Sequence, residues 1–133
     1  RTPALWERIA PDDPDTRDWR WTDEWLAEMA RLGMTPILGL LHHGSGPAYT
    51  SLTADNFVPL FAAQAAATAR RYPQVRDWTP INEPLTTARF SALYGVWYPH
   101  ARDERLFWLA LLNQVDATLA AMAAIRAEIG NAR

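Results

Sequence analysis

Apolar residues along the chain follow two alternating patterns, short continuous runs and stretches at helical spacing. Continuous runs cover 34–41 and 75–81, as expected of strands that are buried on both faces of a parallel sheet. The stretch 2–8 predicts the end of a further strand. Apolar residues at helical spacing predict three long helices and one short one, at 22–32, 58–72, 104–128 and 86–94. The predicted order is β-α-β-α-β-(short α)-α.

Residues at the ends of the predicted helices support these bounds. Thr22 and Asp103 are of the type that caps helix N-termini, and Gly33 suits the position just after a helix. Pro59 is tolerated only if it lies in the first turn of its helix. Gly130 is expected to end the last helix.

Strands that alternate with helices predict an α/β fold with a parallel sheet and right-handed crossovers. The spacing alone does not separate a barrel from a doubly wound sheet. No Gly-x-Gly-x-x-Gly follows a strand, which argues against a dinucleotide site. The chain has 133 residues, and a (β/α)8 barrel needs ~250. Because the chain also opens on Arg1 rather than Met, we expect a fragment.

The composition argues against several classes of binding partner. The net charge is -2, with 13 basic and 15 acidic residues, so no basic field favours nucleic acid or a membrane surface. The continuous apolar runs fall short of the ~20 residues that span a bilayer. There is no cysteine, which excludes thiolate metal sites and suits a cytoplasmic protein, although a missing N-terminus would hide a signal peptide. We expect no metal, no cofactor and a cytoplasmic location.

One short motif carries the candidate chemistry. Asn82-Glu83-Pro84 follows directly on an apolar run, and catalytic groups of parallel α/β proteins lie at the carboxyl ends of strands. Two structural alternatives stay open, a glutamate that pairs with an arginine and a turn asparagine. Strict alternation would send Asn82 and Glu83 to opposite faces of the sheet. Both reach one site only if the pleat breaks there.

The motif, preceded by Trp78, resembles the acid/base element of family 1 glycoside hydrolases, which are retaining enzymes built on (β/α)8 barrels. Segments 5–11, 37–47 and 93–100 resemble, in the same order, the end of the second strand, the third strand and the loop after the fourth. The resemblance covers nearly the whole chain. It implies a single incomplete domain over 1–133, a partial TIM (β/α)8 barrel from the end of strand 2 through the helix after strand 4.

The resemblance also implies roles for individual residues. Glu83 would be the catalytic general acid/base, and Asn82 and His43 would bind the sugar. Trp97 and Tyr98, in the loop above the site, are candidates for lining a sugar subsite. The nucleophile of such enzymes lies on the seventh strand, outside this chain, so the remainder of the barrel is an expected partner. We expect the fragment to be inactive by itself.

Strand alternation predicts the side-chain directions of some residues near the motif and leaves others open. Alternation groups His43 with Gly39 and Leu41, and it turns His42 toward the packed helices in a structural role. Glu7 and Arg8 fall near the tip of the second strand. An arginine close to Glu83 would bias the proton affinity of that carboxyl, but the sequence leaves the direction of both side chains open.

The sequence departs from the family pattern just after the third strand. Gly44 and Ser45 stand where the family usually has an aromatic residue and an acid. Segment 41–47 resembles the glycosidase-like regions found ahead of sugar-nucleotide (dTDP-4-dehydrorhamnose) reductase modules. An alternative function is therefore a module that recognises a sugar or sugar nucleotide without hydrolysing it. A third reading is an alanine-rich α/β domain in which Asn-Glu-Pro is coincidental.

Overall fold

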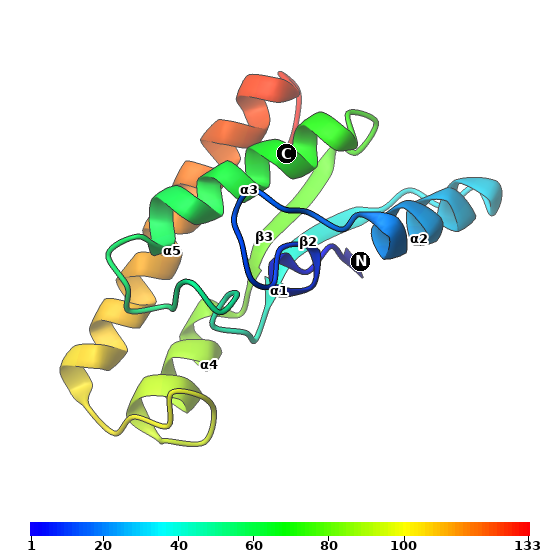
Figure 1. The fold of residues 1–133 in the computed structure, drawn as a ribbon. Coiled ribbons are helices and arrows are strands. Elements are labelled where there is room, and N and C mark those ends of the chain that lie inside the picture. The colour runs from blue at the N-terminus through cyan, green and yellow to red at the C-terminus, as the bar shows by residue number, and fades with distance from the viewer.

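The computed structural model describes residues 1–133 and is built on a parallel sheet of three strands in the order β1-β2-β3. The strands are β1 (Thr2–Pro3), β2 (Ile37–His42) and β3 (Asp77–Asn82). Two long helices, α3 (Phe57–Arg71) and α5 (Glu104–Glu128), lie side by side along one side of the sheet (Figure 1). The remaining helical elements are α1 (Trp6–Ile9), α2 (Arg20–Arg31), α4 (Pro84–Ala88) and the π-helical turn η1 (Arg89–Leu93).

The predicted order of elements is confirmed apart from α1, a short helix that was not predicted, and the first strand is much shorter than predicted. β1 covers only Thr2–Pro3, and the backbone N–H of Ala4 donates to the Gly39 carbonyl as the last link to β2. The chain then coils into α1, whose Trp6 and Ile9 are both buried. Trp6 and Ile9 are three residues apart, so both lie on the same face of one helical turn. In a strand they would point to opposite faces, which explains why the stretch 2–8 is not a single strand.

The start of α2 also differs from the prediction. The helix begins at Arg20, and Thr22 is buried inside its first turn instead of capping it. The N-cap residue is Trp19, which makes no side-chain cap bond, and Asp18 before it accepts a hydrogen bond at Oδ1 from the backbone N–H of Arg20. The predicted end is confirmed, because Gly33 has a φ of 68°, the left-handed conformation that favours glycine after a helix.

The other two long helices agree closely with the prediction. Pro59 is the third residue of α3, so it lies in the first turn, where its missing N–H has no helical partner to lose. α5 has the predicted bounds, and the Oδ1 atom of Asp103 accepts a hydrogen bond from the backbone N–H of Leu106. The helix ends at Glu128, two residues before Gly130.

An aromatic cluster in the core ties α1 to α3. The Trp6 ring lies 5.5 Å from Phe61 and 6.0 Å from Phe57, and all three side chains are fully buried. Leu38 and Leu40 of β2 are buried in the same core. Each buried aromatic side chain removes a large apolar area from water, so this cluster fixes α1 close to the end of β2.

One face of α5 is apolar and exposed. We call Trp108, Leu112, Val115 and Leu119 the α5 stripe, and all four side chains are exposed. α5 is also the one helix that is long and apolar enough to cross a bilayer. Core helices of soluble proteins can have the same length and composition. The opposite face of α5, which includes Ala117 and Ala121, is buried. The stripe lies away from that packed face.

A charged cluster joins α2 to α3. The Asp23 carboxylate accepts hydrogen bonds from the Arg71 guanidinium and from the Tyr72 hydroxyl. The Arg71 bond lowers the pKa of Asp23 below its ordinary value. Burial, followed by the neighbouring Asp23 carboxylate, raises the pKa of Tyr72. The cluster therefore stabilises the packing of α2 on α3 when Asp23 is ionised.

We predict that Asp23→Asn lowers the free energy of unfolding by about 0.5–1 kcal/mol at pH 7. The value is small because the Arg71 and Asp23 side chains are 45% and 37% exposed. Since the folded pKa is lowered, the contribution is complete above the unfolded pKa of ~3.9 and is lost as the pH falls through the folded pKa. Urea unfolding at pH 7 and pH 3 tests this, with the exposed Asp12→Asn as control. An equal loss at both pH values would contradict it.

Candidate functional site

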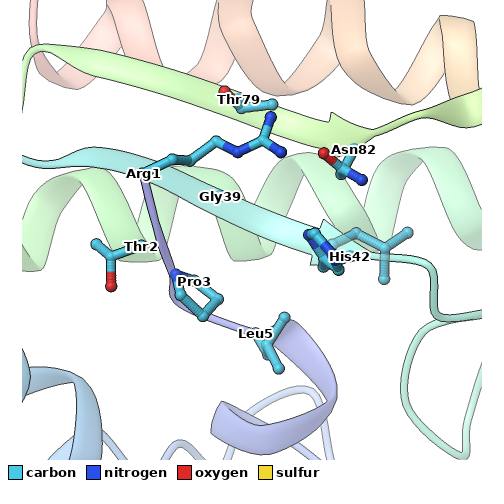
Figure 2. A pocket seen from close by; sticks show the side chains of 9 residues that line it. Arg1, Thr2, Pro3, Leu5, Gly39, His42, Thr79 and Asn82 are labelled. Atoms are coloured by element: carbon cyan, nitrogen blue, oxygen red, sulfur yellow. The ribbon is translucent and has the colours of Figure 1, made fainter.

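The carboxyl ends of β2 and β3 carry the polar residues of the candidate site. His42 pairs in register with Asn82, and each is the last residue of its strand. Register partners in a parallel sheet share a face, so the two side chains lie together. They line a cavity of about 210 Å³ on the side of the sheet away from α3 and α5 (Figure 2). The rest of its lining is Arg1, Thr2, Pro3, Leu5, Gly39, Leu41 and Thr79.

The structure corrects the predicted direction of His42. We expected it to point toward the helices with Leu38 and Leu40, but it is exposed and lines the cavity beside Asn82. The physical reason is that Leu40 and Leu41 are both buried, so the alternation of buried and exposed side chains breaks just before His42. A pattern of strict alternation therefore misjudges the last residue of this strand.

The pleat breaks at Glu83, as a shared site requires. Glu83 has φ 47° and ψ 62°, a left-handed conformation that is costly for a residue with a side chain. Pro84, the first residue of α4, disfavours the ordinary right-handed α conformation at the residue before it. The backbone reversal turns the Glu83 side chain to the strand end, where it is 59% exposed. Strained residues of this kind concentrate at functional sites.

His43 connects the predicted site residues to one another. Its Nε2 lies 3.2 Å from Asn82 Nδ2 and 3.9 Å from Glu83 Oε2. Its Nδ1 lies 3.3 Å from the hydroxyl of Thr87 on α4. Like Glu83, His43 has a positive φ, 58°. The structure therefore brings three of the predicted site residues, Asn82, Glu83 and His43, into one cluster.

The other two predicted site residues lie in a second cavity beside this cluster. Trp97 and Tyr98 line a cavity of about 270 Å³ together with His43 and the loop 44–48. The Trp97 ring centroid is 5.1 Å from that of His43. Ser45 donates a hydrogen bond to the Tyr98 carbonyl, which holds the two loops together. Aromatic faces at an open cavity suit the apolar faces of sugar rings.

Glu7 and Arg8 point in opposite directions. Glu7 turns inward, so close to Gly44 that a Cβ at Gly44 would lie 2.9 Å from Glu7 Oε1. Burial raises the pKa of Glu7, while a backbone hydrogen bond and nearby His42 act in the other direction. Oε2 of Glu7 is buried without a hydrogen-bond partner. Arg8 instead stacks over Trp21 at 4.5 Å, so it does not reach Glu83.

Three residues at the site were not among the predicted ones. Arg1 and Thr79 line the first cavity, and His42 does so against our expectation. The strand register points to Thr79, which pairs with Gly39, whereas His42 lines the cavity only because the alternation breaks at Leu41. Arg1 precedes a strand of two residues, and no sequence pattern indicates its direction.

The arrangement offers acid–base and hydrogen-bonding chemistry. Glu83 supplies an exposed carboxyl, and His43 and Asn82 beside it supply hydrogen-bond donors and acceptors. No group of three or more His, Asp or Glu side chains is placed to hold a metal ion. Only one carboxylate, Glu83, lies at the exposed centre of the cluster. Chemistry that needs a carboxylate pair would take the second one from outside these residues.

The similarity of this chain to known proteins comes from solved structures. No protein-family model and no curated protein matches the sequence. A β-glucosidase from Thermotoga maritima in complex with glucoimidazole matches with a TM-score of 0.86 at 20% identity, over 98% of this chain and 31% of its own. A β-glycosidase from Pyrococcus horikoshii matches with a TM-score of 0.85 at 16% identity, over 96% of this chain and 31% of its own.

A third match is a family 1 β-glucosidase from T. maritima in complex with isofagomine lactam, with a TM-score of 0.86 at 20% identity, over 98% of this chain and 31% of its own. The chain thus spans about a third of the length of each structure. It has the fold of a β-glucosidase segment, a mixed helix and strand unit with a three-stranded parallel sheet that matches part of a TIM barrel.

The burial of Glu7 predicts a pH-dependent stability. Because its folded pKa is raised, the neutral carboxyl stabilises the protein below the unfolded pKa of ~4.3, and this contribution is lost as the pH rises through the folded value. We expect Glu7→Gln, which stays neutral, to gain stability relative to the wild type between pH 4 and pH 7. Denaturant unfolding across this range measures the difference. Exposed Glu104→Gln is the control, and parallel curves for Glu7→Gln and wild type would contradict the prediction.

Proposed function

We propose that the chain is part of a retaining O-glycoside hydrolase that acts on carbohydrate, with Glu83 as the general acid/base. The observation that carries the proposal is the left-handed backbone at Glu83, which brings its carboxyl and Asn82 to one strand end. The similarity to β-glucosidase structures over 98% of the chain supports it. One of those structures holds glucoimidazole, a carbohydrate-like compound, and this supports a carbohydrate ligand here.

In this mechanism Glu83 acts twice. As the neutral acid it donates its proton to the glycosidic oxygen while a second carboxylate attacks the anomeric carbon, which breaks the bond to the leaving group and forms a glycosyl-enzyme. As the carboxylate it then takes a proton from water, which attacks the anomeric carbon and releases the nucleophile. The two carboxyl groups of such a pair lie ~5–5.5 Å apart. We assign the second carboxylate to a later strand, outside these residues.

We further propose that the chain covers the end of barrel strand 2 through the helix after strand 4. Three observations support this extent. The chain spans 31% of the matched structure, β3 pairs only with β2, and the α5 stripe is exposed. In a closed barrel both edges of the sheet pair with neighbouring strands, and each helix packs against the next. The remainder of the barrel would therefore cover these surfaces.

A second candidate function is recognition of a sugar or sugar nucleotide without hydrolysis, in a module fused to a sugar-nucleotide reductase. The observation that favours it is that Gly44 and Ser45 line the second cavity, at positions where the family pattern has larger groups. Fewer side chains there can hold a sugar in the position that hydrolysis requires. Kinetics with full-length protein separates the two candidates.

We predict that Glu83→Gln in the full-length protein lowers kcat for natural glycosides by about 10²–10⁴-fold, the usual contribution of a general acid/base. Substrate binding should change little, because Gln is close to Glu in size. The measurement is hydrolysis of a panel of nitrophenyl and natural glycosides, with Glu24→Gln on the surface of α2 as control. Equal turnover by Glu83→Gln and wild type would contradict the catalytic role. No hydrolysis by well-folded wild type would favour the recognition module.

Residues 1–133 expressed alone should self-associate. Arg133 hydrogen-bonds to the backbone at Arg76 and Trp78, at the start of β3. The rest of that edge of β3 and the α5 stripe present unpaired backbone groups and apolar surface to solvent. Light scattering and thermal melting measure this, and Leu112→Lys with Leu119→Lys should reduce association by charging the stripe. A monomer with a single sharp melting transition would contradict the proposed extent of the barrel.

A further inference from the structure

The His43 ring is held from both sides by neutral polar groups. Nε2 faces the Asn82 carboxamide nitrogen at 3.2 Å, and Nδ1 faces the Thr87 hydroxyl at 3.3 Å. The ring also packs against Trp97, and its side chain is 29% exposed. Two hydrogen bonds and an aromatic contact leave the imidazole little freedom to rotate.

These two contacts are consistent with a single protonation state. An amide nitrogen only donates hydrogen bonds, so Nε2 of His43 must accept through its lone pair. The ring proton of neutral His43 then sits on Nδ1, where it donates to Thr87 Oγ1. An imidazolium would place a second N–H against the Asn82 amide, donor against donor. The geometry therefore selects the neutral Nδ1–H tautomer.

This tautomer determines which end of Asn82 a ligand meets. With Nδ2 engaged by His43, the Oδ1 atom of Asn82 remains as an acceptor on the cavity side. Figure 2 shows this oxygen on the side of the Arg1 guanidinium and the nitrogen on the opposite side. Asn82 lines the cavity together with His42 and Thr79. A ligand hydroxyl in the cavity would thus donate to Asn82.

Protonation of His43 Nε2 removes the lone pair that accepts the hydrogen bond from Asn82 Nδ2, and with it the contact that orients the amide. The Nε2–H of the imidazolium needs an acceptor, either Glu83 Oε2 at 3.9 Å or the Asn82 oxygen after rotation of the amide. The other titratable groups near the ring are His42, edge-on at 4.5 Å, and Glu7, which lies against Gly44. Thr87 and Trp97, from the elements after β3, carry no charge.

We propose that His43 is a positioning residue whose neutral Nδ1–H form fixes the Asn82 carboxamide with its oxygen toward the cavity, so that Asn82 accepts a hydrogen bond from a substrate hydroxyl. Protonation of His43 releases this orientation. The inference deepens the proposed function and rests on it for the identity of the substrate as a glycoside. The role of the tautomer itself does not depend on catalysis.

The kinetic test uses two variants of full-length protein. His43→Asn keeps a residue type that tolerates the positive φ but is too short to reach Asn82, and His43→Gln retains an acceptor that does not titrate. The substrates are a nitrophenyl glycoside and its monodeoxy analogues, each of which lacks one hydroxyl that could donate to Asn82. The ratio of kcat/KM between the parent glycoside and the analogue that loses most reports the contribution of that hydroxyl, and its change between variants reports the part that depends on His43.

In the wild type, we expect acidification that protonates His43 to lower the ratio. His43→Asn should lower it about five- to tenfold at pH 8, the worth of one neutral hydrogen bond. His43→Gln should hold the ratio constant with pH. Should His43→Gln fail to fold, Thr87→Val, which removes the partner of Nδ1–H, should lower the ratio at pH 8. An unchanged ratio in His43→Asn, or the same pH dependence in His43→Gln as in the wild type, would overturn the inference.

A spectroscopic test separates this inference from the proposed function. Long-range ¹H–¹⁵N spectra of histidine-labelled protein distinguish the two neutral tautomers, and the His43 signals are those that vanish in His43→Asn. We expect a protonated Nδ1 and an unprotonated Nε2 in the wild type, with a shift toward the Nε2–H tautomer in Asn82→Ala. A wild-type Nε2–H tautomer would overturn the inference even if hydrolysis is found. An inactive protein with the Nδ1–H tautomer would overturn only the proposed hydrolysis.

Discussion

The pairing of β2 with β3 is the constraint on which the candidate site depends. The register sets Leu41 opposite Ile81 and His42 opposite Asn82, so both strands end at the same level. Leu38 and Leu40 anchor β2 in the core on the helix side, where they are fully buried. A slip of one residue would turn every side chain of β2 to the other face. Burial of these leucines therefore determines where the polar residues at the strand ends lie.

The chain leaves the sheet through strained backbone at both strand ends. His43 follows β2 with φ 58°, and Glu83 follows β3 with φ 47°. Residues with side chains adopt such conformations at a cost of roughly 1–3 kcal/mol each, and the surrounding structure must compensate for it. Here the compensation comes from Pro84 and α4 on one side and from the Asn82 and Thr87 contacts of His43 on the other. Both side chains turn toward the same point as a result.

Local signals explain what the sequence predicted well. β3, α3 and α5 follow from apolar runs, helical spacing and the Asp103 cap, all of which act between residues close in the chain. Each of the predicted residues Asn82, Glu83 and His43 follows a local strand-end signal, and the register of β2 and β3 then brings them together. The break of the pleat at Glu83, stated as a requirement, is present as a left-handed residue.

The predictions that failed, and the residues that were not predicted, depend mainly on contacts between residues far apart in the sequence. The direction of His42 depends on the burial of Leu41 next to it, which only the packed core decides. The inward turn of Glu7 depends on the absence of a side chain at Gly44, more than thirty residues later. Thr22 is buried inside α2 and does not cap it, and Asp18 accepts the hydrogen bond from the first backbone N–H of the helix instead. Arg1 gains its place at the cavity from the pairing of β1 with β2.

The separation of Glu83 from a second carboxyl group tests the central claim most directly, and a crystal structure of the full-length protein with a bound glycoside analogue measures it. The account predicts a second Asp or Glu across the ligand from Glu83, with the two carboxyl groups ~5–5.5 Å apart, as in retaining glycosidases. A separation of ~6.5–9.5 Å would contradict the retaining mechanism. A bound analogue with no second carboxylate near its anomeric carbon would contradict hydrolysis altogether.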